Sequence, residues 1–314
     1  MRFVFILDPL ETLKSYKDSS VAIMMEALRR GHQVFVSMQG DLFLRHEKVC
    51  LLARPFIAKD GPNWFDLGQE TESYPNEFDA VLMRKDPPFD NEYLYSTYLL
   101  EIASKQGANI INDPESVRGW NEKLSIARFP QFAPEFLVTR SSRIIRQFLA
   151  EYGDIVLKPL DGMGGTSIFR LTPNDPNINV IIETITKYEQ ITIMVQRYLP
   201  EIKEGDKRII VIDGEPLPYS LARIPMQGET RGNLAAGGKG VAQPLTSRDY
   251  EIASTVGNTL KKEGLFLVGL DVIGNNLTEI NVTSPTGMVE IANQTDCKPA
   301  IAFMNALENQ CASF

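Results

Sequence analysis

Three oxygen-bearing side chains near the C-terminus could hold a divalent cation: Asp271, Glu279 and Asn281. Glu279 and Asn281 are two positions apart on an expected strand, so both point to one face. If residues 274–276 form a hairpin loop, Asp271 lies opposite Glu279, with Cβ atoms ~5 Å apart. Facing carboxylates repel unless a cation separates them, and oxygen ligands without His or Cys favour Mg²⁺ or Mn²⁺. The alternative is a solvated acidic sheet face, and a two-residue loop would shift this register.

A glycine-rich segment, residues 161–167 (DGMGGTS), could bind phosphate. Gly162, Gly164 and Gly165 permit a tight turn whose N–H groups point at one anion. Lys158 ends the preceding strand and could supply a cation for phosphate oxygens. The segment leads into a strand and not a helix, so it departs from the dinucleotide-binding pattern. An ordinary glycine-rich β-turn is the alternative.

A second glycine-rich stretch shows almost no apolar periodicity. We interpret residues 225–241 as a mobile loop, long enough to close over a site. Arg223, Arg231 and Lys239 would give this segment positive charge, which suits an anionic substrate. Its glycines and lysine are out of step with a Walker loop, and a flexible surface loop is the alternative.

The composition argues against several other classes of function. Lys plus Arg number 32 and Asp plus Glu number 40, giving a net charge of −8, which does not favour nucleic acid or anionic membranes as partners. No apolar run has the length expected of a signal peptide or a membrane-spanning helix. The three cysteines lack metal-type spacing, and only two histidines occur. We therefore expect a cytoplasmic protein with reduced thiols.

Strands and helices alternate up to about residue 120. Apolar segments predict strands at residues 3–7, 33–37, 79–83 and 109–112. Helices are expected after Asp18 and over residues 91–105, while the proline-containing stretch before residue 79 is expected to be irregular. The alternation predicts an α/β fold with a parallel, doubly wound sheet whose ligands bind at the carboxyl ends of the strands. Arg84 directly follows such an end.

Beyond residue 120, paired strands replace this pattern. Strands at 155–158 and 167–171 flank the first glycine-rich segment. Further strands are expected at 192–196, 208–213, 217–223, 266–273 and 277–282. Helices are expected at 177–188, at 247–263 and over most of the chain from residue 288.

Several long strings resemble one known family. They are residues 82–90 (LMRKDPPFD), 121–123 (NEK), 157–165 (LKPLDGMGG), 205–208 (GDKR), 221–225 (LARIP), 228–238 (GETRGNLAAGG) and 277–285 (LTEINVTSP). The chain is similar, up to about residue 286, to the bacterial glutathione synthetases, which are ATP-grasp ligases. The resemblance implies a Rossmann-like N-terminal domain at residues 1–120, an ATP-grasp small lobe at 121–200 and a C-terminal catalytic lobe at 201–314, with ATP clasped between the two lobes.

The resemblance also implies an activity. The chain would join γ-glutamylcysteine to glycine, with ATP giving ADP and phosphate through an acyl phosphate, and so form glutathione. Mg²⁺, with Mn²⁺ possible, would be the cofactor, and a homotetramer is implied. Two alternatives stay open: a related carboxylate–amine ligase with another acceptor, and a nonenzymatic nucleotide-binding module.

Individual roles follow from the same resemblance. The implied ATP-binding residues are Lys123, Lys158, Gly162, Gly164, Gly165, Gln196, Tyr198, Leu199 and Asp206. The implied metal ligands are Asp271, Glu279 and Asn281. The implied substrate-binding residues are Arg84, Arg223, Arg231 and Asn233. The implied catalytic residues are Arg208, Arg223 and Arg231, with Arg208 near the reacting carbonyl.

Overall fold

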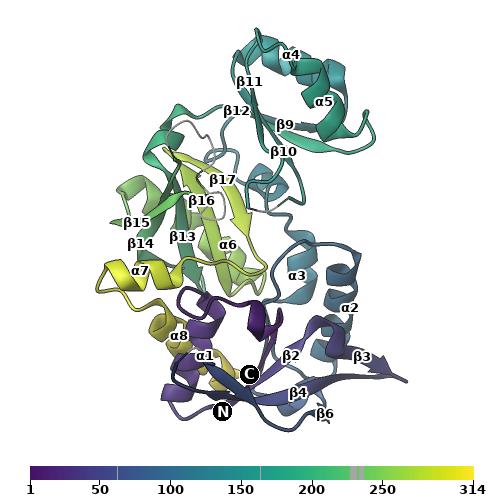
Figure 1. Ribbon diagram of the computed structural model, residues 1–314, viewed down its shortest axis with the longest axis vertical. Coiled ribbons are helices and arrows are strands. Elements are labelled where there is room, and N and C mark those ends of the chain that lie inside the picture. The colour runs from purple at the N-terminus through teal and green to yellow at the C-terminus, as the bar shows by residue number, and fades with distance from the viewer. Residues whose placement is uncertain (62, 163, 227–231, 233–236) are drawn as a thin grey trace.

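Three β-sheets follow one another along the long axis of the molecule (Figure 1). The computed structural model describes residues 1–314 except residues 62, 163, 227–231 and 233–236. In Figure 1 the N-terminal sheet lies at the base, the third sheet in the middle and the small second sheet at the top. Both termini lie at the base, so the C-terminal helices return to the N-terminal end.

The N-terminal sheet has the strand order β3-β4-β2-β1-β7-β8, with β5 and β6 also paired to β4. Its strands are β1 (Arg2–Leu7), β2 (Gln33–Met38), β3 (Leu42–Arg45), β4 (Lys48–Ala58), β5 (Phe65–Leu67), β6 (Thr71–Ser73), β7 (Ala80–Met83) and β8 (Ile110–Ile111). As expected, β1, β2, β7 and β8 pair in parallel. Helices α1 (Ser19–Arg29) and α2 (Asn91–Lys105) begin after Asp18 and Asp90, whose carboxylates accept the N–H of Val21 and Tyr93.

The expectation of an irregular stretch before residue 79 was wrong. Strands β3 to β6 occupy much of it, and β4 pairs antiparallel with β2. Pro55 lies inside β4, where its carbonyl still accepts the N–H of Gly68 at 2.8 Å. A proline lacks only the donor of a strand residue, so it ends a strand only where that donor is needed.

The second sheet is antiparallel, in the order β11-β10-β12-β9. Its strands are β9 (Phe136–Thr139), β10 (Ile155–Pro159), β11 (Phe169–Leu171) and β12 (Ile193–Arg197). Helices α4 (Ser142–Tyr152) and α5 (Ile178–Thr186) supply Ile145 and Ile182 to a core with Ile155 and Leu157. Because side chains alternate along a strand, Val156 and Lys158 face away from that core.

The third sheet is also antiparallel, in the order β15-β14-β13-β16-β17. Its strands are β13 (Asp206–Ile212), β14 (Glu215–Ile224), β15 (Lys239–Pro244), β16 (Leu267–Ile273) and β17 (Asn276–Asn281). The loop expected to run to residue 241 is shorter, because β15 begins at Lys239 and pairs with Ile224. Helix α6 (Ser247–Lys262) packs against β13 and β14.

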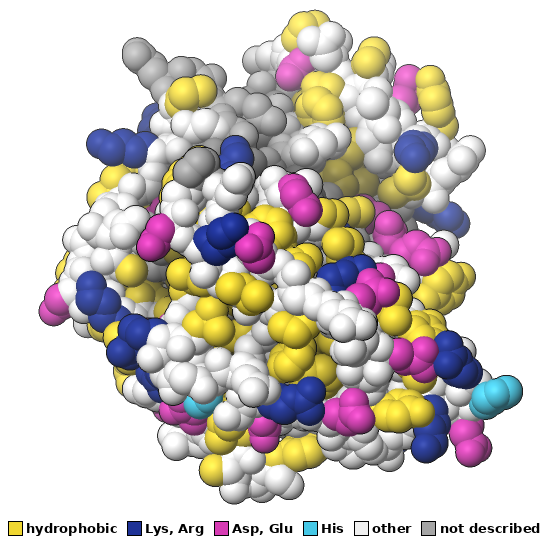
Figure 2. Space-filling model, turned by 60° about the horizontal axis from the view of Figure 1, so that its bottom comes forward, with side chains coloured by type: hydrophobic (Ala, Val, Ile, Leu, Met, Phe, Trp, Pro, Cys, Tyr) yellow, Lys and Arg dark blue, Asp and Glu magenta, His cyan; other side chains and the backbone are white. Residues whose placement is uncertain are grey.

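The remaining helices connect the parts. They are α3 (Pro114–Gly119), α7 (Met288–Gln294) and α8 (Pro299–Ser313). Helix α8 packs on α1, where Arg30 donates to the Glu308 carboxylate at 2.9 Å. The face in Figure 2 carries acidic and basic side chains interspersed. In the part of the chain that the structure describes, no helix has both the length and the apolar character needed to span a membrane.

A buried ion pair anchors the hairpin of β16 and β17 to helix α6. Lys207, which faces away from Asp206 and Arg208 on β13, donates to the Asp249 carboxylate and to the Gly274 carbonyl in the hairpin turn. Asp249 is almost fully buried and also exchanges hydrogen bonds with Thr246 at the start of α6. One ammonium group therefore holds the turn, the sheet and the helix together.

We predict that Lys207→Met lowers the free energy of unfolding by about 3–5 kcal/mol, because it leaves a buried carboxylate without its partner. Chemical denaturation of the nucleotide-free protein measures this. The matched control is Lys261→Met, which removes an exposed pair with Asp213 and should cost about 0–1 kcal/mol. Equal losses in the two variants would contradict the prediction.

Candidate active site

A cavity of ≈ 280 Å³ lies between the second and third sheets and reaches the N-terminal domain. Most of the residues singled out from the sequence line it: Lys123, Lys158, Gly162, Gly164, Gly165, Gln196, Tyr198, Leu199, Asp206, Arg208, Arg223, Asp271, Glu279 and Asn281. Arg84 is not among the lining residues. Arg231 and Asn233 lie outside the residues that the structure describes.

The hairpin of β16 and β17 brings Asp271 opposite Glu279, as the sequence predicts, but by another route. The turn has only two residues, because Ile273 pairs with Asn276, so the expected three-residue loop was wrong. A bulge after Asp271 then inserts Thr278 and restores the pairing. The Thr278 hydroxyl donates to the Asp271 carbonyl at 3.1 Å, which stabilises the bulge.

Two arginines share the carboxylate of Asp271. Arg208 binds it through Nε and Nη2 at 2.5 and 3.0 Å, and Arg223 Nη2 lies 2.8 Å from Oδ2. Asn281 Nδ2 donates to the same oxygen at 3.3 Å. Burial alone would raise the pKa of Asp271, but the two guanidinium groups outweigh it and hold that pKa well below its usual range. Asp271 therefore stays ionised.

Asp206 extends this network on β13. Its Oδ2 accepts from Arg223 Nη2 at 2.5 Å, while its buried Oδ1 has no hydrogen-bond partner. Burial, reinforced by nearby Asp271 and Glu279, raises the pKa of Asp206 to about 6 even though Arg223 opposes the shift. An unpartnered carboxylate oxygen in a cavity can accept a hydrogen bond from a ligand hydroxyl.

Two lysines converge on Glu279. Their Nζ atoms lie 4.0 Å (Lys123) and 3.9 Å (Lys158) from Glu279 Oε1. Burial lowers the pKa of Lys158, whereas for Lys123 the carboxylates of Glu279 and Glu122 outweigh burial and raise the pKa. Both ammonium groups are buried at the cavity wall, where a low dielectric strengthens their attraction for anions.

The glycine-rich turn lies beside these lysines. Lys123 Nζ donates to the Gly162 carbonyl at 2.7 Å. Gly164 and Gly165 have φ of +64° and +79°, in the left-handed region that side chains disfavour. Glycine is therefore required here by conformation, and the turn is held against one of the lysines.

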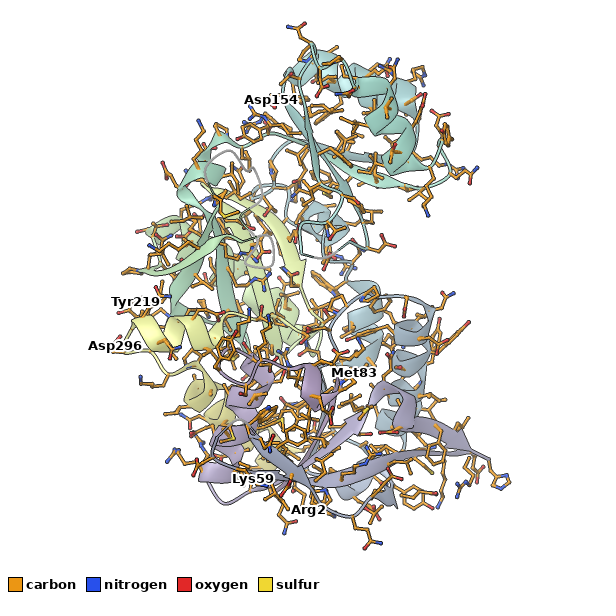
Figure 3. All side chains as sticks on the ribbon, in the orientation of Figure 1. Arg2, Lys59, Met83, Asp154, Tyr219 and Asp296 are labelled. Atoms are coloured by element: carbon orange, nitrogen blue, oxygen red, sulfur yellow. The ribbon has the colours of Figure 1, made fainter. Side chains whose placement is uncertain are left out.

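Another part of the cavity is a slot beside Tyr198, which Arg170 also lines. Gln196 and Leu199 line it, and the buried Gln196 Nε2 has no hydrogen-bond partner. Arg170 stacks 3.7 Å from the centre of the Tyr198 ring and is held by Asp154, labelled in Figure 3. A flat base with hydrogen-bonding edges fits such a slot.

Arg84 plays a different part from the other predicted residues. It follows Met83, the last residue of β7, which lies where the N-terminal domain meets the third sheet (Figure 3). Arg84 is buried and donates to Ser20 Oγ and to the Pro285 carbonyl, each at 2.9 Å. It therefore ties the N-terminal domain to the segment that follows β17, and its substrate-binding role stays a prediction.

The donor set of Asp271, Glu279 and Asn281 consists of oxygen atoms, which suit Mg²⁺. Mg²⁺ is commonly held by one or two carboxylates together with ligand phosphates, and not by a closed protein cage. The described residues contain no group of three or more His, Cys, Asp or Glu side chains placed to hold a metal. The residues present fit a cation that arrives with a phosphate ligand.

Two family models match most of the chain. The N-terminal domain of prokaryotic glutathione synthetase matches residues 1–118, and its ATP-grasp domain matches residues 122–296. The chain belongs to the prokaryotic glutathione synthetase family. Relatives named glutathione synthetase include one from Nitrosomonas europaea, 57% identical over 99% of both chains, and one from Pseudomonas aeruginosa, 52% identical over 100% of this chain and 99% of the relative.

Solved structures show the same fold at low identity. D-cycloserine synthetase DcsG has a TM-score of 0.70 at 15% identity and covers 99% of this chain and 100% of its own. D-alanyl-alanine synthetase A from Vibrio cholerae has a TM-score of 0.62 at 13% identity, covering 100% and 99%. The α/β fold with a Rossmann-like domain and an ATP-grasp fold is confirmed, as is an ATP-dependent ligase of the glutathione synthetase type.

The sequence analysis gave no role to two acidic residues of the cavity, Glu122 and Asp86. Glu122 adjoins Lys123 and binds its ammonium group, and Asp86 lies in the 82–90 string. Both residues belong to sequence strings that indicate the family, but the strings alone do not predict a role for either side chain. Only the fold shows that both carboxylates face the cavity.

Glu122 predicts a pH dependence of stability. Burial, opposed by Lys123, raises the pKa of Glu122 from 4.5 to about 7. Between pH 4.5 and pH 7, Glu122 keeps its proton in the folded protein but loses it in the unfolded chain. The protonated carboxyl group therefore contributes its full stability below pH 4.5, and this stability is lost as the pH rises through 7. Glu122→Gln cannot ionise, so it should gain stability over the wild type with rising pH, by on the order of 3 kcal/mol at pH 8.

Denaturation of both proteins at pH 5 and pH 8, without nucleotide or metal, measures the difference. The exposed Glu204, changed to Gln, is the control and should show no such trend. A stability difference that stays constant between the two pH values would contradict the assignment.

Proposed function

We propose that this protein makes glutathione from γ-glutamylcysteine, glycine and ATP, and that the cavity between the second and third sheets is its active site. Relatives of 51–57% identity carry the name glutathione synthetase, which supports the reaction. The observation that supports the site is the convergence of Lys123 and Lys158 on Glu279 beside the glycine-rich turn. Buried cations beside turn N–H groups suit a triphosphate.

ATP would lie along the cavity from the slot beside Tyr198 to the lysines. Its base would fit beside Gln196, Tyr198 and Leu199, where the Gln196 amide offers a free donor. The free Oδ1 of Asp206 would accept a ribose hydroxyl. The phosphates would meet Lys123, Lys158 and the turn at Gly162, Gly164 and Gly165.

Mg²⁺ would be held by Asp271, Glu279 and Asn281 together with ATP phosphates, and Mn²⁺ could use the same ligands. A fold relative, the ATP-grasp ligase PsnB, was solved with Mg and ADP at 17% identity and a TM-score of 0.62. The cation would neutralise charge on the phosphoryl group that is transferred.

The substrate carboxylate is a poor electrophile, so its conversion to an acyl phosphate comes first. The lysines neutralise the γ-phosphoryl group as it moves to the cysteinyl carboxylate, and ADP leaves. The glycine amine then attacks the acyl carbon, phosphate departs and the peptide bond forms. Arg208 and Arg223, which Asp271 binds, would stabilise the oxyanion of the tetrahedral intermediate. For Arg231 and Asn233, the proposed role in substrate binding rests only on the family resemblance.

We propose further that the enzyme acts in the cytoplasm as a homotetramer. The three cysteines are free thiols in this structure, which suits a reducing compartment. The tetramer rests on the family resemblance, and a sizing measurement of the full chain tests it.

Product analysis tests the reaction itself. With ATP and Mg²⁺, we expect ADP to form in equal amounts with glutathione only when γ-glutamylcysteine and glycine are both present. Competing dipeptides and amines, tested one at a time, separate this activity from that of a ligase with another acceptor. ATP binding without release of ADP would leave only a nucleotide-binding module.

Glu279→Gln tests the metal-ligand role. We predict that turnover at ordinary Mg²⁺ falls by about 100-fold or more. Substituting a residue that only supports a metal ligand already lowers metal affinity or activity by about 10- to 100-fold. Raising Mg²⁺ should restore part of the rate, since affinity and not the chemical step is weakened. Glu263→Gln, at an exposed position, is the control, and full turnover by Glu279→Gln would refute the role.

A further inference from the structure

Asp86 places a carboxylate on the part of the cavity wall that the N-terminal domain supplies. Asp86 and Pro87 both line the cavity, directly after the carboxyl end of β7. The backbone there is firmly held. The Asp86 N–H donates to Asp8 Oδ2 at 3.0 Å, and Lys85 Nζ binds both Asp8 Oδ1 and the Asp86 carbonyl at 2.8 Å. These contacts with Asp8 and Lys85 hold the backbone at Asp86 in place.

This carboxylate differs from the others in the cavity because no lysine or arginine among the described residues forms an ion pair with it. Glu122, Asp206, Asp271 and Glu279 each lie within 4.0 Å of a lysine or arginine nitrogen. Within the described part of the chain, Asp86 forms no ion pair; the hydroxyl of nearby Ser284 donates to the Arg84 carbonyl at 3.1 Å. Partial burial raises the pKa of Asp86, as expected for a carboxylate whose charge is not fully compensated.

The nearest guanidinium does not fill this role. Arg84 uses its donors on Ser20 and Pro285, and its Nη1 is buried without a partner. The Lys85 ammonium is held by the Asp8 carboxylate and the Asp86 backbone. A partly buried carboxylate that lines the cavity and forms an ion pair with neither Arg84 nor Lys85 is suited to bind a cation that the ligand brings.

The reaction has two such cations, the ammonium groups of glycine and of the γ-glutamyl residue. The glycine nitrogen must lose its proton before it attacks, and a salt bridge to a carboxylate would stabilise the protonated form. The γ-glutamyl ammonium takes no part in bond making and stays charged throughout. An ion pair with Asp86 is therefore compatible with catalysis for the second group and opposes it for the first.

We propose that Asp86 binds the α-ammonium group of the γ-glutamyl residue and so selects dipeptides that carry a free amino group at that end. The inference rests on the proposed function, since it names a contact for the substrate of that reaction. It makes Asp86 a specificity-determining residue, remote from the bonds that change. The N-terminal domain would then bind the γ-glutamyl end of the dipeptide, while residues of the second and third sheets act on its cysteinyl carboxylate.

The test compares γ-glutamylcysteine with glutarylcysteine, the same molecule without the α-amino group. The wild type is first shown to form glutathione and ADP from γ-glutamylcysteine, and failure at this step rejects the proposed function and not the contact. The wild type should then favour γ-glutamylcysteine in kcat/KM by about 10- to 100-fold, the range of a charge-assisted hydrogen bond. Asp86→Asn should reduce that preference to less than about threefold and leave kcat/KM for glutarylcysteine unchanged.

Retained activity on glutarylcysteine also shows that Asp86→Asn is folded. Asp90→Asn is the matched control in the same segment, because Asp90 does not line the cavity and Asn caps a helix as well as Asp. An unchanged preference in Asp86→Asn, or equal losses on both dipeptides, would overturn the proposal. A rise confined to the KM of glycine would do the same and would assign Asp86 to the other ammonium group.

Discussion

The proposed active site depends on a buried aspartate that binds two arginines. Removing Asp271, Arg208 and Arg223 from water costs free energy that only close ion pairs offset, so the three groups fix one another. The arginines thus face the cavity in one arrangement before any substrate arrives. Donors that are already oriented need no reorganisation when negative charge develops on the substrate, which is the main source of electrostatic catalysis.

The period of a β-strand decides which side chains reach this network. On β13, Asp206 and Arg208 face the cavity, while Lys207 between them faces helix α6 and binds Asp249. On β10 the same alternation sends Leu157 into the helix-covered core and Lys158 into the cavity. A shift of one residue in either strand would turn the side chains that now face the cavity towards the helices, and those that face the helices towards the cavity.

The sequence correctly predicted that Asp271 lies opposite Glu279, but not the turn and bulge that bring the two together. Spacing alone could not distinguish a three-residue loop from a two-residue turn with a bulge at Thr278, because both give the same pair. Strand β4 was missed because Pro55 was weighed as a breaker, although its missing N–H is not needed there. Asp86 was missed for a further reason, since the lack of a counter-ion is a property of the folded cavity and leaves no mark in the sequence.

The ion pairs of this structure also indicate how the site would respond to its ligands. Glu279 Oε1 lies 4.0 Å from the ammonium nitrogen of Lys123 and 3.9 Å from that of Lys158, and its charge partly compensates both. A triphosphate carries more negative charge than a single carboxylate. It would therefore bind both ammonium groups through charge-assisted hydrogen bonds in place of Glu279. Glu279 would then be free to hold the cation that accompanies the nucleotide. If Glu279 is a metal ligand as proposed, the same carboxylate would compensate the lysines before nucleotide binds and hold the metal afterwards, which would couple metal binding to nucleotide binding.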